Sequence, residues 1–172
     1  MDTVESVLWL KKNYLFNRCT SYAQKLKVVF TECLQTKDED VLVIGDTGLL
    51  DHQVAPIFAG ACFLAARALN HNAKLVLKAN LDEKADDEVR IHLERLRPES
   101  AVVLSTSGKI GSISTVGKPF KQLCKEKRLR YTSTPSLGTL KTGMISSLID
   151  SVYIDYNSLR QLHNAVKKVI DE

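Results

Sequence analysis

The chain has 172 residues, the size of one ordinary domain, and is long enough to bury a substantial core. With 44% hydrophobic and 26% charged residues, its composition is typical of a soluble globular protein and excludes a largely disordered one. The formal net charge is only +4, and Lys and Arg are scattered, with "KEKRLR" at residues 125–130 as the densest run. This distribution argues against nucleic acid as the primary partner, which needs a basic face with interleaved aromatic residues.

The N-terminal part of the chain, up to Leu34, is predicted to be helical. Apolar residues recur at i, i+3/i+4 and i+7 from Tyr22 to Leu34, a spacing that indicates an amphipathic helix, and a shorter helical stretch precedes it. Trp9 is interpreted as a packing residue. The run "QTKDED" ends this region.

Strands then alternate with helices of about ten or more residues. The predicted strands are "DVLVIG", "AKLVLKA", "SAVVLST" and "LRYTST", and "VYI" at residues 152–154 is a small fifth candidate. The predicted helices are an Ala-rich stretch through residue 69, "ADDEVRIHLERL", "VGKPFKQLCKEK" with Pro119 in its first turn, and "GMISSLID". The pattern predicts a single α/β domain over residues 1–172, Rossmann-like or flavodoxin-like. We expect three layers, a mainly parallel sheet with helices on both faces, preceded by the N-terminal helices.

The chain closes with "DYNSLRQLHNAVKKVIDE", predicted as an amphipathic helix with Asp155 as its N-cap. Its apolar stripe is formed by Leu159, Leu162, Val166 and Ile170. If this stripe lies exposed in the structure, a partner surface is the simplest account of it.

Ligands of parallel α/β sheets bind at the carboxyl ends of the strands, where three loops are expected. "GDTG" at residues 45–48 lacks the G-x-G-x-x-G pattern, and Asp46 would repel phosphate, so this turn is interpreted as a corner whose glycines give backbone freedom. The second loop, "STSGKIGSIS", is not a Walker A loop, but its hydroxyls, cation and backbone N–H groups could hold an anion. The third, "TSTPSLGTLKTG", has a similar composition, and the two loops on adjacent strand ends together mark the best candidate cleft. The residues predicted to bind a ligand are Ser105, Ser107, Gly108, Lys109, Ser136 and Lys141.

No catalytic residue and no metal ligand is predicted. The four histidines are widely spaced, and G-x-S-x-G is absent. The four cysteines form no CxxC pair, and are predicted to be buried small side chains in a reducing compartment. Because no secretory signal is recognised and the longest apolar run, residues 54–66, is too short to span a bilayer, a cytoplasmic location without a membrane partner is expected.

"VLVIGDTGLLDHQVAPIFAGACFLAARAL" and the C-terminal "SLGTLKTGMISSLIDSVYIDYNSLRQLHNAVKKVIDE" resemble the N-terminal domain of the aminopeptidase T family of metallo-aminopeptidases. The resemblance implies an N-terminal part of a longer two-domain hydrolase, which helps to shape the substrate cleft and subunit contacts. In that family the ligands of the divalent metal lie in the C-terminal catalytic domain, so no ligand and no cofactor is carried over to this chain. That catalytic domain is the implied partner. The resemblance leaves open whether the chain also forms a homodimer. An iron-dependent ring-cleaving dioxygenase group shares the layout, which leaves the parent chemistry open.

"AVVLSTSGKIGS" is also similar to the Ser-x-Ser-Gly loop of sugar isomerase domains. That resemblance implies an alternative function, a phosphate or sugar-phosphate binding module that uses Ser105, Ser107, Gly108 and Lys109. Ile110 departs from the pattern, since a Thr usually follows close behind the Gly. "GDTG" also replaces the upstream glycine-and-serine turn.

Overall fold

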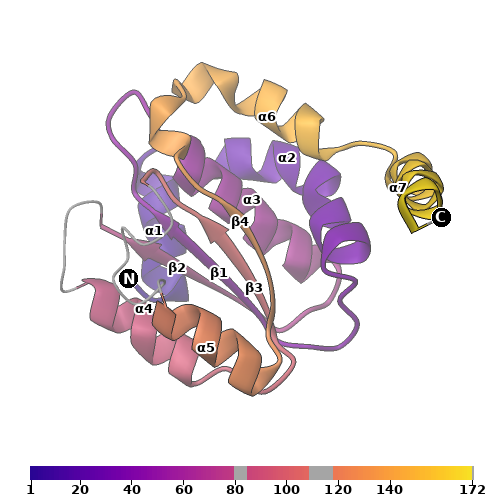
Figure 1. Ribbon diagram of the computed structural model, residues 1–172. Helices are drawn as coiled ribbons and strands as arrows, with labels where there is room; N and C mark the ends of the chain where they lie inside the picture. Colours follow the sequence, from indigo (N-terminus) through magenta and orange to yellow (C-terminus); the bar gives the residue numbers. More distant parts are fainter. Residues whose placement is uncertain (80–84, 109–117, 172) are drawn as a thin grey trace.

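The computed structural model describes residues 1–79, 85–108 and 118–171 (Figure 1). It contains a four-stranded parallel sheet in the order β2-β1-β3-β4. The strands are β1 (Val41–Asp46), β2 (Ala73–Lys78), β3 (Ala101–Ser105) and β4 (Arg130–Thr134). Helices lie on both faces of the sheet and further helices precede it, which confirms the predicted fold class.

The chain is doubly wound around β1. Helix α3 (Val54–Ala68) packs on one face of the sheet, while α4 (Ala85–Glu94) and α5 (Lys118–Lys127) lie on the other face (Figure 1). The chain first steps outward from β1 to β2 and then returns past β1 to β3. The strand order therefore reverses between β1 and β3, and this switch point is where open α/β sheets form their ligand crevice.

Strand β1 is buried along its whole length, as its unbroken apolar run predicts for a central parallel strand. The odd-numbered Val41 and Val43 join the core beneath α3. The even-numbered Leu42 and Ile44 join the core beneath α4 and α5. Two separate cores on the two faces of one strand follow directly from the two-residue period of side chains along a strand.

Helix α3 is buried between the sheet and α2 (Phe16–Val28), and small residues make both contacts possible. On the sheet side, a Cβ at Gly45 would lie 2.7 Å from the Cβ of Ala59. On the outer side, a Cβ at Gly60 would lie 2.6 Å from the Sγ of Cys19. Burial raises the pKa of Cys19 to about 12, so this thiol is a packing group, as predicted.

Helix α1 (Thr3–Lys12) covers the outer edge of β2. The hydroxyl of Thr3 accepts a hydrogen bond from the backbone N–H of Leu75 at 3.0 Å, and the buried Ser6 hydroxyl accepts one from Leu77 at 2.9 Å. These N–H groups point away from β1, and an open strand edge invites pairing with another chain. The N-terminal helix therefore closes one edge of the sheet by side-chain hydrogen bonds.

The C-terminal region differs from the predicted fifth strand at "VYI". Val152 is the last residue of α6 (Ile145–Val152), and the N–H of Tyr153 caps that helix by donating to the carbonyl of Ile149. No strand of the described sheet lies beside these residues, so the β-branched run has no partner and the strand prediction is wrong. Short 3₁₀ turns, η3 (Leu137–Thr139) and η4 (Thr142–Met144), precede α6.

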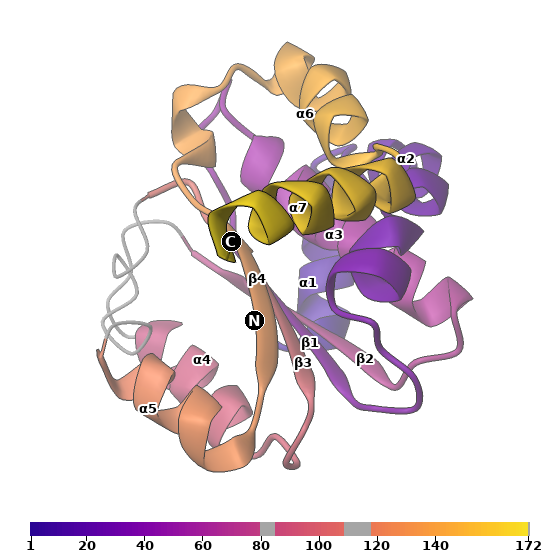
Figure 2. The ribbon, with the colours of Figure 1, turned by 45° about the vertical axis from the view of Figure 1, so that its right-hand side comes forward.

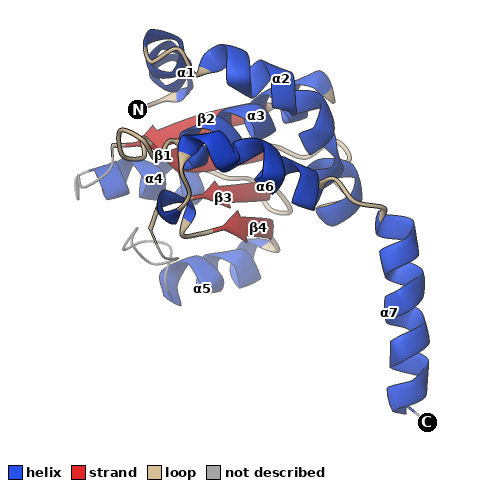
Figure 3. Ribbon diagram, turned by 90° about the horizontal axis from the view of Figure 1, so that it is seen from above, coloured by secondary structure: helices blue, strands red, loops and turns tan. Residues whose placement is uncertain are grey.

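Helix α7 (Tyr156–Asp171) projects away from the domain in Figure 3 and lies in front of it in the view of Figure 2. The carboxylate of Asp155 accepts hydrogen bonds from the N–H groups of Asn157 and Ser158 at 3.0 and 3.2 Å. Asp155 is therefore the N-cap, as predicted. No residue of α7 is buried.

Candidate functional site

The carboxyl ends of β1 and β3 lie side by side at the switch point, since Gly45 is paired in register with Ser105. Asp46 ends β1, and Ser107 follows β3 after one further residue. This is the position at which the fold places ligands. The candidate site is therefore the set of polar groups around Asp46 and Ser107.

The carboxylate of Asp46 organises this site. One oxygen, Oδ1, accepts hydrogen bonds from the Ser107 hydroxyl at 2.5 Å and from the N–H of Gly48 at 3.0 Å. The other oxygen, Oδ2, accepts from the N–H of Ser107 at 2.7 Å. Asp46 is only 5% exposed, and hydrogen bonds that N–H groups donate to a charged acceptor are stronger than those between neutral groups. The carboxylate thus ties the loop after β1 to the loop after β3.

The loop after β4 packs against the loop after β3. The N–H groups of Ser136, Leu137 and Gly138 donate to the carbonyls of Gly108, Thr106 and Ser107, at 2.7, 3.0 and 3.0 Å respectively. A Cβ at Gly138 would lie 2.8 Å from the Ser107 carbonyl oxygen, so a larger residue there would push the two loops apart. The structure therefore brings together the second and third loops that were predicted to share one cleft.

The residues predicted to bind a ligand are placed as follows. Ser105 is buried, and its hydroxyl donates to the Ala55 carbonyl of α3 at 3.0 Å, which pins that helix to β3. Ser107 donates to Asp46, and the carbonyl of Gly108 accepts from Ser136. Ser136 has φ +62° and supplies a sharp turn. Lys141 is exposed, and Lys109 lies outside the described residues.

Two residues of this site were not among those predicted. Asp46 was interpreted as a residue that would repel phosphate, and the structure shows that its carboxylate accepts hydrogen bonds from Gly48 and Ser107. Lys78, which ends β2, is 8% exposed and lies opposite Asp46 in the parallel register. An Asp two residues before a glycine with φ +67° is the one local signal for Asp46, because Asx turns of this kind fold the carboxylate back on the chain.

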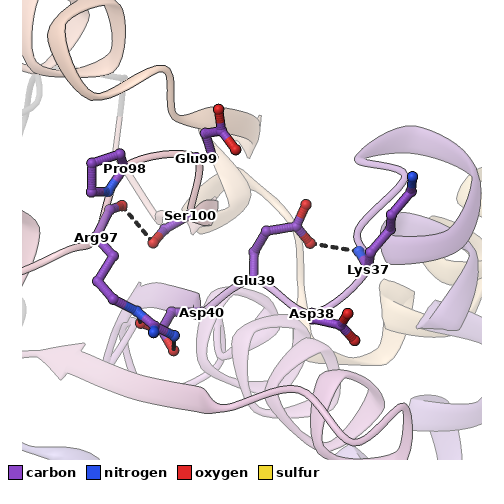
Figure 4. A pocket seen from close by; sticks show the side chains of 8 residues that line it. All are labelled: Lys37, Asp38, Glu39, Asp40, Arg97, Pro98, Glu99 and Ser100. Carbon is purple, nitrogen blue, oxygen red and sulfur yellow. Dashed lines mark hydrogen bonds and ion pairs between the residues drawn. The ribbon is translucent and has the colours of Figure 1, made fainter.

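At the amino ends of the strands, opposite the candidate site, a depression of about 500 Å³ is lined by charged residues (Figure 4). The Asp40 carboxylate accepts two hydrogen bonds from the Arg97 guanidinium, at 2.6 and 2.8 Å, and one from the Asn72 amide at 2.7 Å. Arg97 and then Asn72 hold the pKa of Asp40 below its usual value. Three of the carboxylates here, Asp40, Glu39 and Glu99, form ion pairs with arginines at the amino ends of the strands, so we interpret this depression as a structural feature.

This ion pair makes stability depend on pH in a defined direction. Because the pKa of Asp40 is lowered by folding, its contribution is present above the unfolded value of about 3.9 and is lost as pH falls further. Asp40→Asn is expected to lower the free energy of unfolding by about 1 kcal/mol at pH 7, because the ion pair is partly exposed. The difference in stability between this variant and the wild type should shrink below pH of about 4. Urea denaturation midpoints of both proteins at pH 7 and pH 3 measure this difference.

Glu99→Gln is the matched control, since Glu99 faces Arg128 at 3.8 Å and both side chains are exposed. It should change neither midpoint. A gap for Asp40→Asn that stays constant down to pH 3 would contradict the assignment.

Among residues 1–79, 85–108 and 118–171, no three His, Cys, Asp or Glu side chains come together as metal ligands. Within the same ranges, no helix has the length and apolar character needed to cross a membrane. Comparisons of the chain with family models, with curated proteins and with solved structures find no match.

Proposed function

We propose that the chain is a non-catalytic α/β domain, equivalent to the N-terminal domain of an aminopeptidase T-like metalloprotein, and that it docks through α7. Its role would be to support a metal-binding catalytic domain, shape the substrate cleft and make subunit contacts. The observation that carries the proposal is the unpartnered apolar face of α7. The sequence resemblance supplies the class of partner.

The apolar face of α7 is exposed along the helix beyond its first turn. Leu162 is 60% exposed, Val166 49%, and Val169 and Ile170 are each 75%. Together with Ala165, the last three line a shallow hollow of about 290 Å³, large enough to receive an apolar side chain. A contiguous apolar face of this kind marks an interaction surface.

The base of α7 is held on the domain by side-chain contacts, although no residue of the helix is buried. The Cys33 thiol donates to the Tyr156 hydroxyl at 3.1 Å, and that hydroxyl donates to the Val152 carbonyl at 3.0 Å. Arg160 pairs with Glu32. Burial and then the bond from Cys33 raise the pKa of Tyr156 to about 12. Cys33 is exposed, so the prediction that every cysteine is buried is wrong for this residue, which helps to anchor α7 instead.

The length of α7 gives it little stability as an isolated helix. A helix of 16 residues is about 24 Å long and only just exceeds the length of about 12–15 residues below which isolated helices are marginal in water. In proteins, most helical stability comes from packing of the apolar face. Burying an exposed Leu, Val or Ile side chain contributes about 1.5–3 kcal/mol, so a partner surface would order α7 and bind it at the same time.

The alternative function, a phosphate or sugar-phosphate module, has less support. Its hydroxyl and N–H donors at Ser107 already bond to the Asp46 carboxylate, and the Ser105 hydroxyl is engaged inside the core. A phosphate at this point would face a buried negative charge. We therefore expect no phosphate or sugar phosphate to raise the melting temperature of the wild-type chain.

The catalytic part of the proposal is tested by an aminopeptidase assay. The purified chain, supplied in turn with Zn²⁺, Co²⁺ or Mg²⁺, should hydrolyse L-leucine p-nitroanilide no faster than the same metal in buffer. Saturable hydrolysis that a chelator abolishes would overturn the assignment of a non-catalytic domain.

If α7 is a docking surface, a charged residue in its apolar stripe should leave the stability of the domain unchanged. Leu162→Glu should change the free energy of unfolding by no more than about 0.5 kcal/mol, as expected for an exposed position. In the neighbouring α6, Ile149 is 0% exposed, and Ile149→Ala should cost about 2–5 kcal/mol. If Leu162→Glu proves as costly as Ile149→Ala in urea denaturation, the stripe packs on this domain and is not a docking surface.

A further inference from the structure

The loops after β1 and β3 aim three hydrogen-bond donors at one point. They are the N–H of Gly48, the N–H of Ser107 and the Ser107 hydroxyl, and all three reach the carboxylate of Asp46 at 3.0 Å or less. Backbone N–H groups and a hydroxyl that converge on one anion form the donor set with which proteins bind free oxyanions. The set lies at the switch point, where doubly wound sheets bind external ligands.

We propose that these donors form a small oxyanion site that the chain occupies with its own Asp46 carboxylate. The carboxylate crosses from the end of β1 to the loop after β3 and fills the position that a bound carboxylate would take. Because Asp46 is only 5% exposed and engages all three donors, these donors are not available to a second anion. The contact is therefore self-inhibitory in the wild-type chain.

The rest of the site would survive loss of the Asp46 side chain. Both N–H donors belong to the backbone, and the loop that carries Ser107 is held by hydrogen bonds from the loop after β4. Removing the carboxylate leaves a polar space whose donors have lost their acceptor, at a position beside the buried Lys78 on β2. A small carboxylate such as formate or acetate matches what was removed.

The inference predicts chemical rescue of Asp46→Ala. Melting temperatures of the full chain are compared in sodium formate, acetate and chloride at equal ionic strength and pH 7. Formate should raise the melting temperature of the variant above its value in chloride, saturably, and leave the wild type unchanged. At ten times its dissociation constant, formate should raise the folded-to-unfolded ratio of the variant about eleven-fold.

The control is the double variant Asp46→Ala, Ser107→Ala, which lacks the hydroxyl donor and should bind formate more weakly. If Asp46→Ala is unfolded in chloride, its circular dichroism spectrum should become native-like in formate, and Asp46→Ser provides a second variant for the same comparison. Equal behaviour in formate and chloride for both variants would overturn the inference. So would the same formate shift in wild type. Either result leaves the docking role of α7 unaffected, because that role rests on a separate surface.

Discussion

Alanine in place of Gly45 is expected to lower the free energy of unfolding by about 2 kcal/mol, within the range for an overpacked core. The added Cβ would lie 2.7 Å from the Cβ of Ala59, 3.0 Å from Leu77 Cδ2 and 3.3 Å from the Ser105 carbonyl oxygen. Leu77 can change rotamer, but the Ala59 Cβ moves only with α3. That helix is held where it is by the bond from Ser105 to Ala55.

The sign of this effect distinguishes packing from backbone entropy. Gly45 has no positive φ, so alanine fits its backbone conformation and would by itself stabilise the chain by about 0.4–1 kcal/mol. Gly143 is the matched control, since a Cβ there meets nothing within 4 Å. Urea denaturation should show a loss for Gly45→Ala and little change for Gly143→Ala. Equal or greater stability of Gly45→Ala would show that α3 does not approach β1 as closely as described.

Asparagine in place of Asp46 should cost about 3 kcal/mol, the scale of a charge-assisted hydrogen bond to a buried group. The amide keeps one acceptor oxygen, but its NH₂ group must then replace an oxygen that accepts from Gly48, from the Ser107 hydroxyl or from the Ser107 N–H. At least one donor loses its acceptor in either orientation, and both the Gly48 N–H and the Ser107 hydroxyl do so when the NH₂ group takes the place of Oδ1. The size of the side chain hardly changes, so the loss reports on hydrogen bonding and charge alone.

Asp51→Asn serves as the control for Asp46→Asn, because Asp51 lies in the same connection and is exposed. It should stay within about 0.5 kcal/mol of wild type. The two variants are compared by urea denaturation at pH 7. If Asp46→Asn unfolds at the same urea concentration as Asp51→Asn, the Asp46 carboxylate does not hold the two loops together.

The fold could be predicted because its signals are local. The β-branched runs of β1 and β3, the turns between elements and the Asp155 N-cap each act over a few residues. The prediction of a fifth strand was wrong because strand formation also depends on contacts that are not local. "VYI" has the composition of a strand, but a strand also needs a free edge beside it, and Val152 is already committed to α6.

The candidate site could be predicted only in part because its contacts are long-range. Asp46 and Ser107 are 61 residues apart, and only the strand order brings them together. Sequence reasoning placed the loops after β3 and β4 in one cleft from their position alone. It took Ser105 for a ligand residue because nothing in the sequence shows that its hydroxyl faces α3.

For α7 the periodicity predicted the apolar stripe but not the surface that covers it. Four apolar residues at helical spacing give the same sequence pattern whether they pack on their own domain or on another one. The exposure of Leu162 and Val166 removes the first alternative among the described elements. The class of partner comes from the family resemblance and therefore requires a binding experiment.

The most direct measurement is a calorimetric titration of the chain with the separately purified metal-binding domain of an aminopeptidase T enzyme. Wild type should bind, and Leu162→Glu should bind at least ten times more weakly, a difference of about 1.4 kcal/mol, because a carboxylate would enter an apolar contact. Lys141→Gln, at an exposed position outside α7, should bind as wild type does. Absence of wild-type binding, or equal binding by Leu162→Glu, would contradict a docking role for α7.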